Sequence, residues 1–211
     1  MSDIAILGAG KFGTALARIM AEAGYDIAIA RSGDPEPIAL TVSILAPGAT
    51  AMTKEEAIAG TDVVVLAIPL SSYKTLNPEA LAGKIVIDAM NYWWETDGRD
   101  SPLAHAEPSS SELVAEHLHQ SRVVKGFNHI GYHDITGEVR EAGSPDRIAV
   151  ALASDDAEAL AHVGELVSRV GFDPLPLGSL HEGKKLEPGN PAFGASIPLA
   201  ELQHLLAENG I

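Results

Sequence analysis

The fold class that the sequence predicts is α/β, with a doubly wound, mainly parallel sheet and helices on both of its faces. Strand-like apolar runs alternate with helical stretches along most of the chain, and this order builds such a sheet. Two runs, "DVVVLAI" (62–68) and "KIVIDAM" (84–90), are largely apolar and rich in β-branched residues, as are strands buried on both faces. The 211 residues are expected to form one domain, 1–211, with a short helical extension over about 179–211.

Each expected element has a signal of its own. The stretch 11–24 has apolar residues at helical spacing, and Thr53 with Glu56 forms a capping box that opens a helix. Gly171 is expected to end a helix in the left-handed conformation. The expected helices are 11–24, 36–46, 53–59, 109–120, 155–171 and 198–209. The expected strands are 3–8, 26–30, 49–52, 62–68, 84–90, 122–127, 147–153 and 172–178. The last is at best a short edge strand, because its prolines cannot donate ladder hydrogen bonds, and 93–111 is expected to be a long loop near the site.

The composition excludes several classes of function. The chain has 29 acidic residues against 14 lysines and arginines, a formal charge of −15, and no basic cluster of the kind that nucleic acid requires. Without cysteine it has no disulfide, thiolate metal site or thiol nucleophile. Its apolar runs are shorter than the roughly 20 residues of a membrane span, and no export signal is seen at the N-terminus. We therefore expect a cytoplasmic protein without a nucleic-acid or membrane partner.

A glycine-rich sequence, "GAGKFG" (8–13), follows the first expected strand and opens the first expected helix. In that context a GxGxxG pattern indicates a dinucleotide site, unless the glycines only turn a corner. Gly8 would allow the tight turn, Gly10 would let the backbone approach a pyrophosphate, and Gly13 would let helix and strand pack closely. The phosphates would lie on the free amides at the helix N-terminus. The predicted cofactor-binding loop is Gly8, Ala9, Gly10, Lys11, Phe12 and Gly13.

The type of nucleotide is set at the end of the second expected strand, where NAD proteins usually have an acid for the ribose 2′-hydroxyl. This chain reads "IARSGD", with Arg31 and Ser32 at that place. A guanidinium can pair with a 2′-phosphate in a bidentate manner, and a hydroxyl can donate to it. We therefore predict that the cofactor is NADP(H). Asp34 could serve a 2′-hydroxyl instead, although it lies three residues later in a Gly/Pro turn.

The segments that follow the middle strands are the next candidates, because ligands of open α/β sheets lie beyond the carboxyl ends of the strands. Trp93 and Trp94 are adjacent in a chain with only 5% aromatic residues. Flat apolar surfaces suit a ring-shaped second ligand, unless the tryptophans only cap the edge of the core. The residues expected at this rim are Ile68, Pro69, Leu70, Met90, Asn91, Tyr92, Trp93 and Trp94.

The segment "KGFNHIGYHD" after the sixth expected strand brings Lys125, Asn128, His129 and His133 near the same rim. Asn128 and His129 are the candidate catalytic residues, with no role assigned. His129 and His133 have i, i+4 spacing, but Gly131 lies between them and no third ligand is indicated, so no metal is expected. Hydride transfer to a ring requires stacking and distance more than an acid–base pair, which agrees with the lack of a Ser/His/Asp or paired-carboxylate pattern.

Together these motifs resemble one family over nearly the whole chain, the NADPH-dependent coenzyme F420 reductases. The motifs that carry the resemblance are the glycine loop, the Arg-Ser pair, "AIP" (67–69), "DAMNYW" (88–93), "SSSELVAEHL" (109–118), "RVVKGFNHIGYHD" (122–134) and "GFDPLPLGSLHEGKKLEPGNPAFG" (171–194). The cytosolic oxidoreductase domains of the six-transmembrane metalloreductases are similar as well, especially in "VVKGFN" and "LGSL". The resemblance implies a Rossmann-type fold, an oxidoreductase and a homodimer.

The resemblance also implies the ligands and where they bind. NADP(H) and a coenzyme F420, FMN or FAD ring would stack face to face, as hydride donor and small-molecule redox acceptor. It maps Gly8–Gly13, Arg31, Ser32, Ile68 and Pro69 to NADP(H), and the loops around Met90–Trp94 and Asn128–Ile130 to the acceptor. The implied contacts of the acceptor ring are Tyr92, Trp93, Trp94, Asn128, His129 and Ile130. Asn128 stands where the archaeal F420 enzymes have histidine, and the order Arg31-Ser32 reverses their Ser-Arg.

Two other functions remain open from the sequence. The β-hydroxyacid dehydrogenases use a lysine and an asparagine three or four residues apart, as Lys125 and Asn128 are, but they need a further helical domain to complete the substrate pocket. The second alternative is a non-catalytic NADPH-binding sensor. Turnover with a hydroxyacid would favour the dehydrogenase, and NADPH binding without any turnover would favour the sensor.

Overall fold

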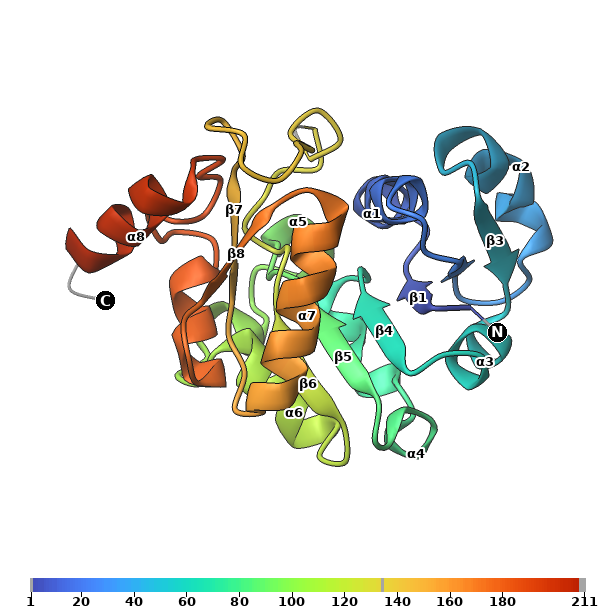
Figure 1. Cartoon of the computed structure of the whole chain (residues 1–211). Coiled ribbons are helices and arrows are strands. Elements are labelled where there is room, and N and C mark those ends of the chain that lie inside the picture. Colours follow the sequence, from blue (N-terminus) through green and yellow to red (C-terminus); the bar gives the residue numbers. More distant parts are fainter. Residues whose placement is uncertain (1, 134, 209–211) are drawn as a thin grey trace.

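The computed structural model describes residues 2–133 and 135–208, and a six-stranded parallel sheet forms its centre (Figure 1). The strands are β1 (Ile4–Leu7), β2 (Ile27–Ala30), β3 (Ala49–Met52), β4 (Val63–Leu66), β5 (Ile85–Asp88) and β6 (Arg122–Lys125). Their order is β3-β2-β1-β4-β5-β6, which is the order of a Rossmann-type sheet, with its reversal point between β1 and β4. The predicted fold class is confirmed.

Helices cover both faces of this sheet. On one face lie α1 (Lys11–Glu22), α2 (Glu36–Leu45) and α7 (Ala157–Val170), and on the other lie α3 (Lys54–Ala59), α4 (Pro78–Leu81) and α6 (Ser110–His117). Alternate residues of a strand enter opposite cores: Ile4 and Ile6 pack in one, Ala5 and Leu7 in the other. Every residue of β4 and β5 is buried, as their continuous apolar runs predict.

Side-chain caps fix several helix ends where the sequence places them. The Thr53 hydroxyl accepts the N–H of Glu56 at 3.2 Å, and the Glu56 carboxylate accepts the N–H of Thr53 at 3.2 Å, so the predicted capping box opens α3. Ser109 and Glu112 form the same arrangement at α6. Gly171 ends α7 in the left-handed conformation, with φ 119°, which a glycine adopts without a Cβ penalty.

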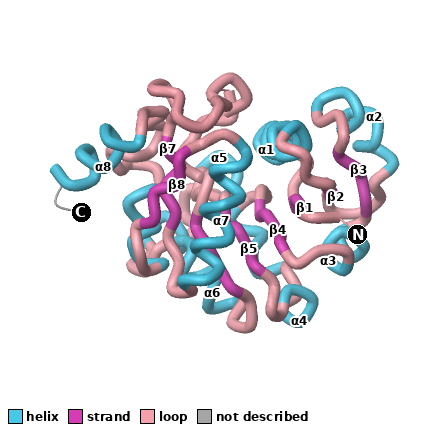
Figure 2. The backbone as a smooth tube through the Cα atoms, in the orientation of Figure 1, coloured by secondary structure: helices cyan, strands magenta, loops and turns pink. Residues whose placement is uncertain are grey.

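The strands β7 (Ala149–Leu152) and β8 (Asp173–Pro176) form a separate two-stranded parallel sheet (Figure 2). Prolines fit in β8 because they alternate with residues whose backbone N–H groups donate hydrogen bonds to the neighbouring strand. The N–H of Asp173 donates to the carbonyl oxygen of Ile148, and beyond the end of β8 the N–H of Leu177 donates to that of Leu152. The helix α8 (Leu199–Glu208) packs Leu202 and Leu206 against this sheet. Asn209, the last residue of the helix expected at 198–209, lies outside the described residues.

Short helical turns occur in several segments for which no individual helix was predicted. Two of them, α5 (Trp94–Asp97) and the 3₁₀ turn η2 (Pro102–His105), lie within 93–111, which was expected to be a long loop; the 3₁₀ turn η1 (Leu70–Thr75) follows β4, and the 3₁₀ turn η3 (Leu180–Leu186) lies in the predicted helical extension. Turns of this length have too few residues for a periodic apolar pattern. Asp97 ties α5 to η1, because its carboxylate accepts the N–H groups of Ser71 and Trp93, each at 2.8 Å. No helix within the described ranges has the length and apolar character needed to cross a membrane.

Candidate active site

Two adjoining cavities lie at the carboxyl edge of the central sheet. The first has a volume of about 440 Å³ and lies beyond β1, β2 and β4, and the second has about 470 Å³ and lies beyond β4, β5 and β6. Both are lined by Gly10, Ala67, Ile68 and Pro69. The two cavities therefore form a continuous double site at the reversal point of the sheet, where open α/β sheets bind ligands.

The glycine loop forms the wall between the cavities and α1. Gly8 has φ 124°, and a Cβ there would lie 2.1 Å from the carbonyl oxygen of Ala67. A Cβ on Gly13 would lie 1.8 Å from the carbonyl oxygen of Gly8, so the helix packs against the turn more closely than any side chain permits. A Cβ on Gly10 would meet nothing within 4 Å. No side chain caps the N-terminus of α1 at Gly10, so its first amides can bind an anion.

Arg31 and Ser32 are exposed and line the first cavity just beyond the end of β2. Asp34 does not line it; its carboxylate accepts the N–H of Glu36 at 2.9 Å, in the turn that begins α2. The residue considered for a ribose 2′-hydroxyl is thus used in local structure. Lys54 also lines the first cavity, although it was not among the predicted site residues. Its position two residues after an expected strand (49–52) was the available signal.

Apolar and aromatic side chains dominate the second cavity. Its lining includes Phe12, Met90, Trp93, Ile130, Tyr132 and Phe193, with Lys11, Asn91, Thr96, Asn128 and His133 as the polar members. The rings of Trp93 and Phe193 meet edge to face, with centroids 5.6 Å apart. Phe193 lies in the late Pro/Gly loop, which therefore forms part of the cavity wall. From the sequence it stayed open whether this loop closes the cleft or forms a dimer contact, and Phe193 was not among the predicted site residues, because no local pattern gives the direction of its ring.

Two asparagines join the loops on either side of the second cavity. The side-chain amide of Asn91 donates to the carbonyl oxygen of Asn128 at 2.7 Å, and that of Asn128 donates to Oδ1 of Asn91 at 3.0 Å and to the Leu186 carbonyl at 2.7 Å. Asn128 is buried, and its Oδ1 has no hydrogen-bond partner among the described residues. A buried acceptor without a partner is costly, so the two asparagines join these loops at the expense of one unsatisfied oxygen.

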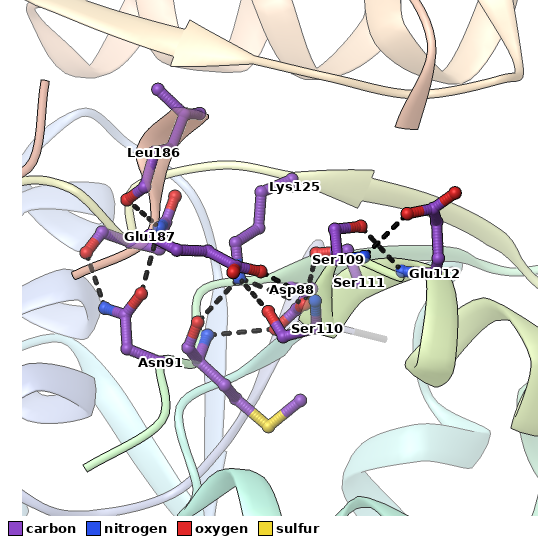
Figure 3. A network of polar contacts seen from close by, with 11 residues as sticks. Asp88, Asn91, Ser109, Ser110, Ser111, Glu112, Lys125, Leu186 and Glu187 are labelled. Atoms are coloured by element: carbon purple, nitrogen blue, oxygen red, sulfur yellow. Dashed lines mark hydrogen bonds and ion pairs between the residues drawn. The ribbon is translucent and has the colours of Figure 1, made fainter. Parts of the chain in front are cut away.

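Lys125 lines neither cavity, contrary to its expected place near the rim; Figure 3 shows it within a network of polar contacts that includes Asp88 and Ser110. It is fully buried, and its Nζ donates to the Met90 carbonyl at 2.7 Å and to Ser110 Oγ at 3.1 Å, and pairs with Asp88 at 3.3 Å. The buried Asp88 carboxylate also accepts from Ser111 Oγ at 2.6 Å and from the N–H of Met90 at 2.9 Å. Lys125 therefore supports the Met90–Asn91 loop, and the geometry does not favour the lysine of a hydroxyacid dehydrogenase.

His129 also lies away from both cavities, contrary to its expected place beside the acceptor. Phe127 has a left-handed backbone, with φ 62°, and after this turn Asn128 lines the cavity whereas His129 is fully buried. Its Nε2 accepts the N–H of Ala151 at 3.0 Å, which requires a neutral ring. Burial lowers the pKa of His129 to about 4, with a smaller opposing effect from the backbone of Ala192.

Three further residues expected at the rim lie elsewhere. Leu70 is buried in the core beneath the sheet. The Tyr92 hydroxyl donates to the Gly98 carbonyl at 2.8 Å, and its side chain lines a small separate cavity of about 200 Å³. Trp94 is exposed and stacks on Arg99, whose guanidinium carbon is 3.8 Å from the ring centroid. In each case the direction of the side chain is set by tertiary contacts, which the order of strands and loops in the sequence does not reveal.

The neutral His129 predicts a specific loss of stability in acid. Its pKa falls from about 6.5 in the unfolded chain to about 4 in the fold, so the unfolded state binds more protons between these values. This residue therefore stabilises the fold fully above about pH 6.5, and about 3 kcal/mol is lost as the pH falls through 4. Urea unfolding of His129→Gln between pH 7.5 and 4 is expected to show a shallower pH dependence than the parent. The exposed His162→Gln variant is expected to match the parent, and equal slopes for all three proteins would contradict the assignment.

Comparison with known proteins agrees with this geometry. Residues 3–92 match the family model described as NADP oxidoreductase coenzyme F420-dependent. Metalloreductase STEAP3 of Rattus norvegicus is 28% identical over 186 residues, which cover 87% of this chain and 35% of the relative. The chain thus spans about a third of the length of the curated relatives that it matches.

Two solved structures share the fold over almost their whole length. The hypothetical protein SMa0349 from Sinorhizobium meliloti has a TM-score of 0.80 and 29% identity, with 94% of this chain and 96% of that chain covered. A protein from Arthrobacter sp. FB24, assigned as an F420-dependent NADP reductase, has a TM-score of 0.70 and 24% identity, with 100% and 96% covered; at this identity the likeness concerns the fold alone. The resemblance expected from the motifs is confirmed: over residues 3–92 the chain matches the coenzyme F420-dependent NADP oxidoreductases, and it has the Rossmann-type fold of NADP-dependent oxidoreductases.

Proposed function

We propose that this chain transfers a hydride between NADP(H) and a flavin or deazaflavin ring, with coenzyme F420 among the acceptors. The observation that carries the proposal is the double cavity: one half is lined by a glycine loop and a free arginine, and the other by flat apolar side chains. When bound, the dihydronicotinamide supplies the hydride. The protein holds the two rings together and excludes water, which is the main requirement of this chemistry.

The first cavity fits a phosphorylated dinucleotide. Gly10 leaves its cavity side open, so phosphate oxygens can reach the backbone amides of α1. Arg31 makes no hydrogen bond or ion pair with another described residue, and it is therefore available to a 2′-phosphate beside Ser32. A local positive site is required here, because the chain as a whole carries a formal charge of −15.

The second cavity fits a flat ring with few polar contacts. Trp93, Phe193 and Ile130 offer apolar surface, and the polar side chains of the lining are few: Lys11, Asn91, Thr96, Asn128 and His133. Such a lining suits the flat face of a flavin-like ring or of the nicotinamide. Among the described lining residues there is no carboxylate pair and no Ser/His/Asp set, so the lining offers stacking and orientation rather than acid–base catalysis.

The names of the similar proteins support the same reaction class. The matching family model concerns coenzyme F420-dependent NADP oxidoreductases, and the curated relatives are metalloreductases. These names point to different electron acceptors, but all of them describe enzymes that catalyse oxidation–reduction. We therefore propose that NADP(H) is the ligand that this chain shares with these similar proteins, and that the acceptor is the ligand that differs among them.

The reaction is tested by mixing the protein with NADPH and one acceptor at a time: F420, FMN, FAD or a ferric chelate. Oxygen is excluded, and the absorbance of the reduced nicotinamide is followed. Oxidation of NADPH by F420 or by a flavin is the expected result. Tight NADPH binding without turnover would instead identify a sensor, and reduction of NADP⁺ by a hydroxyacid, with no oxidation of NADPH by any of these acceptors, would identify a dehydrogenase. Either outcome would contradict the proposal.

The two adjacent tryptophans provide a matched pair for the acceptor site. Trp93→Ala removes a ring that lines the second cavity, whereas Trp94→Ala removes a ring that stacks on Arg99 outside it. Loss of one aromatic contact is worth about 1 to 1.5 kcal/mol, so the acceptor KM is expected to rise roughly five- to tenfold in Trp93→Ala. The NADPH affinity of Trp93→Ala should stay near the parent value. In Trp94→Ala both the acceptor KM and the NADPH affinity should stay near the parent values. Equal effects of the two substitutions would place the acceptor elsewhere.

A further inference from the structure

We infer that Lys54 is a second cation for the 2′-phosphate of NADP(H), beside Arg31 in the lining of the first cavity. The inference rests on the proposed function, because it concerns the ligand of that site. It goes further in naming the residue by which this chain distinguishes the phosphorylated nucleotide. The glycine loop cannot distinguish NADP(H) from NAD(H), since this loop would contact the pyrophosphate that the two nucleotides share.

The register of two neighbouring strands brings Lys54 and Arg31 to the same edge. β2 and β3 are parallel, with Ala30 paired to Met52. Arg31 follows Ala30 directly, and Lys54 comes two residues after Met52. Both side chains line the first cavity, together with Ser32. Two strand ends thus place a guanidinium and an ammonium around one space, and this arrangement suits a dianionic phosphate.

Lys54 has no structural partner that explains its charge. Within the described residues its ammonium makes no hydrogen bond or ion pair, and the side chain is only partly exposed. It is the first residue of α3, where a cation is disfavoured by the helix dipole and an acid would be preferred. Glu56, on the same helix, is held by Thr53 in the capping box. A charge at an unfavourable helix position, facing a cavity, points to a ligand.

The surroundings of Arg31 explain why a second cation is useful. The segment after β2 reads "RSGDPEP", so Asp34 and Glu36 follow Arg31 within five residues. Their negative charges oppose a 2′-phosphate, and nothing else in the turn is basic. Lys54 supplies the missing positive charge from the next strand rather than from the same turn.

Calorimetric titration of Lys54→Met with NADP⁺ and NAD⁺ tests the inference. A charge-assisted contact is worth enough to lower NADP⁺ affinity roughly tenfold or more, whereas NAD⁺ affinity should stay within about twofold. Titration with 2′,5′-ADP and 5′-AMP should show the same contrast without the nicotinamide half. Lys54→Arg is expected to retain most of the preference, because it keeps the charge.

Lys74→Met is the matched control, since Lys74 is exposed, lies over the Tyr73 ring and lines neither cavity. It should leave both affinities unchanged, and thermal melts should show that every variant is folded. Equal losses for both nucleotides in Lys54→Met, or an unchanged preference, would overturn the role of Lys54 while leaving the proposed function intact. A parent protein that binds NADP⁺ no more tightly than NAD⁺ would instead overturn the cofactor assignment itself.

Discussion

Replacing Lys125 with methionine is expected to lower the free energy of unfolding by about 3–5 kcal/mol, because it leaves the Asp88 carboxylate buried without its counter-charge. Methionine fills a similar volume, so most of the loss is electrostatic. The carbonyl oxygen of Met90 also loses its donor at 2.7 Å, which adds an unsatisfied group. Urea unfolding monitored by circular dichroism measures the change.

The double variant Lys125→Met with Asp88→Asn separates charge from packing. Asparagine keeps an oxygen that can accept the N–H of Met90 and removes the buried negative charge, so the double variant is expected to be more stable than Lys125→Met alone. The two effects should be strongly non-additive, as for residues in one network. Lys74→Met, at an exposed lysine, should change stability by less than about 0.5 kcal/mol. A loss below about 1 kcal/mol in Lys125→Met would show that the pair carries little of the stability of the fold.

The order of the central elements could be predicted because the signals are local. Continuous apolar runs mark β4 and β5, capping boxes mark α3 and α6, and Gly171 marks the end of α7. Each signal lies within a few residues of the feature that it causes. The separation of β7 and β8 into their own sheet depends on long-range packing, and no local pattern carries that information.

The candidate site divides in the same way. The rule that ligands lie beyond strand ends predicts that Gly10, Arg31, Ile68 and Asn128 lie near one another, and all four line the double cavity. It cannot give the direction of the next side chain. The left-handed turn at Phe127 sends His129 into the core, and no helix or strand period predicts such a turn.

Adding one methyl group at Gly13 is expected to destabilise the fold by about 3 kcal/mol or more, whereas the same addition at Gly10 should cost about 1 kcal/mol or less. A Cβ on Gly13 would lie 1.8 Å from a backbone oxygen, and backbone cannot swing aside as a side chain does. Gly10 has φ −80° and nothing within 4 Å of its Cβ position, so alanine fits there with only the loss of a favourable N-cap residue.

For cofactor binding, in contrast to stability, the substitution at Gly10 is expected to have a large effect. Gly10→Ala places its methyl group in the space through which a pyrophosphate would reach the amides of α1, so NADP(H) affinity should fall at least roughly tenfold in a protein that stays folded. Urea unfolding and calorimetric titration of Gly10→Ala and Gly13→Ala separate the two effects. The substitutions are identical and three residues apart, but the added methyl group meets backbone at Gly13, whereas at Gly10, which lines both cavities, it enters open space. Full NADP(H) affinity in Gly10→Ala would therefore show that the dinucleotide does not lie on this loop.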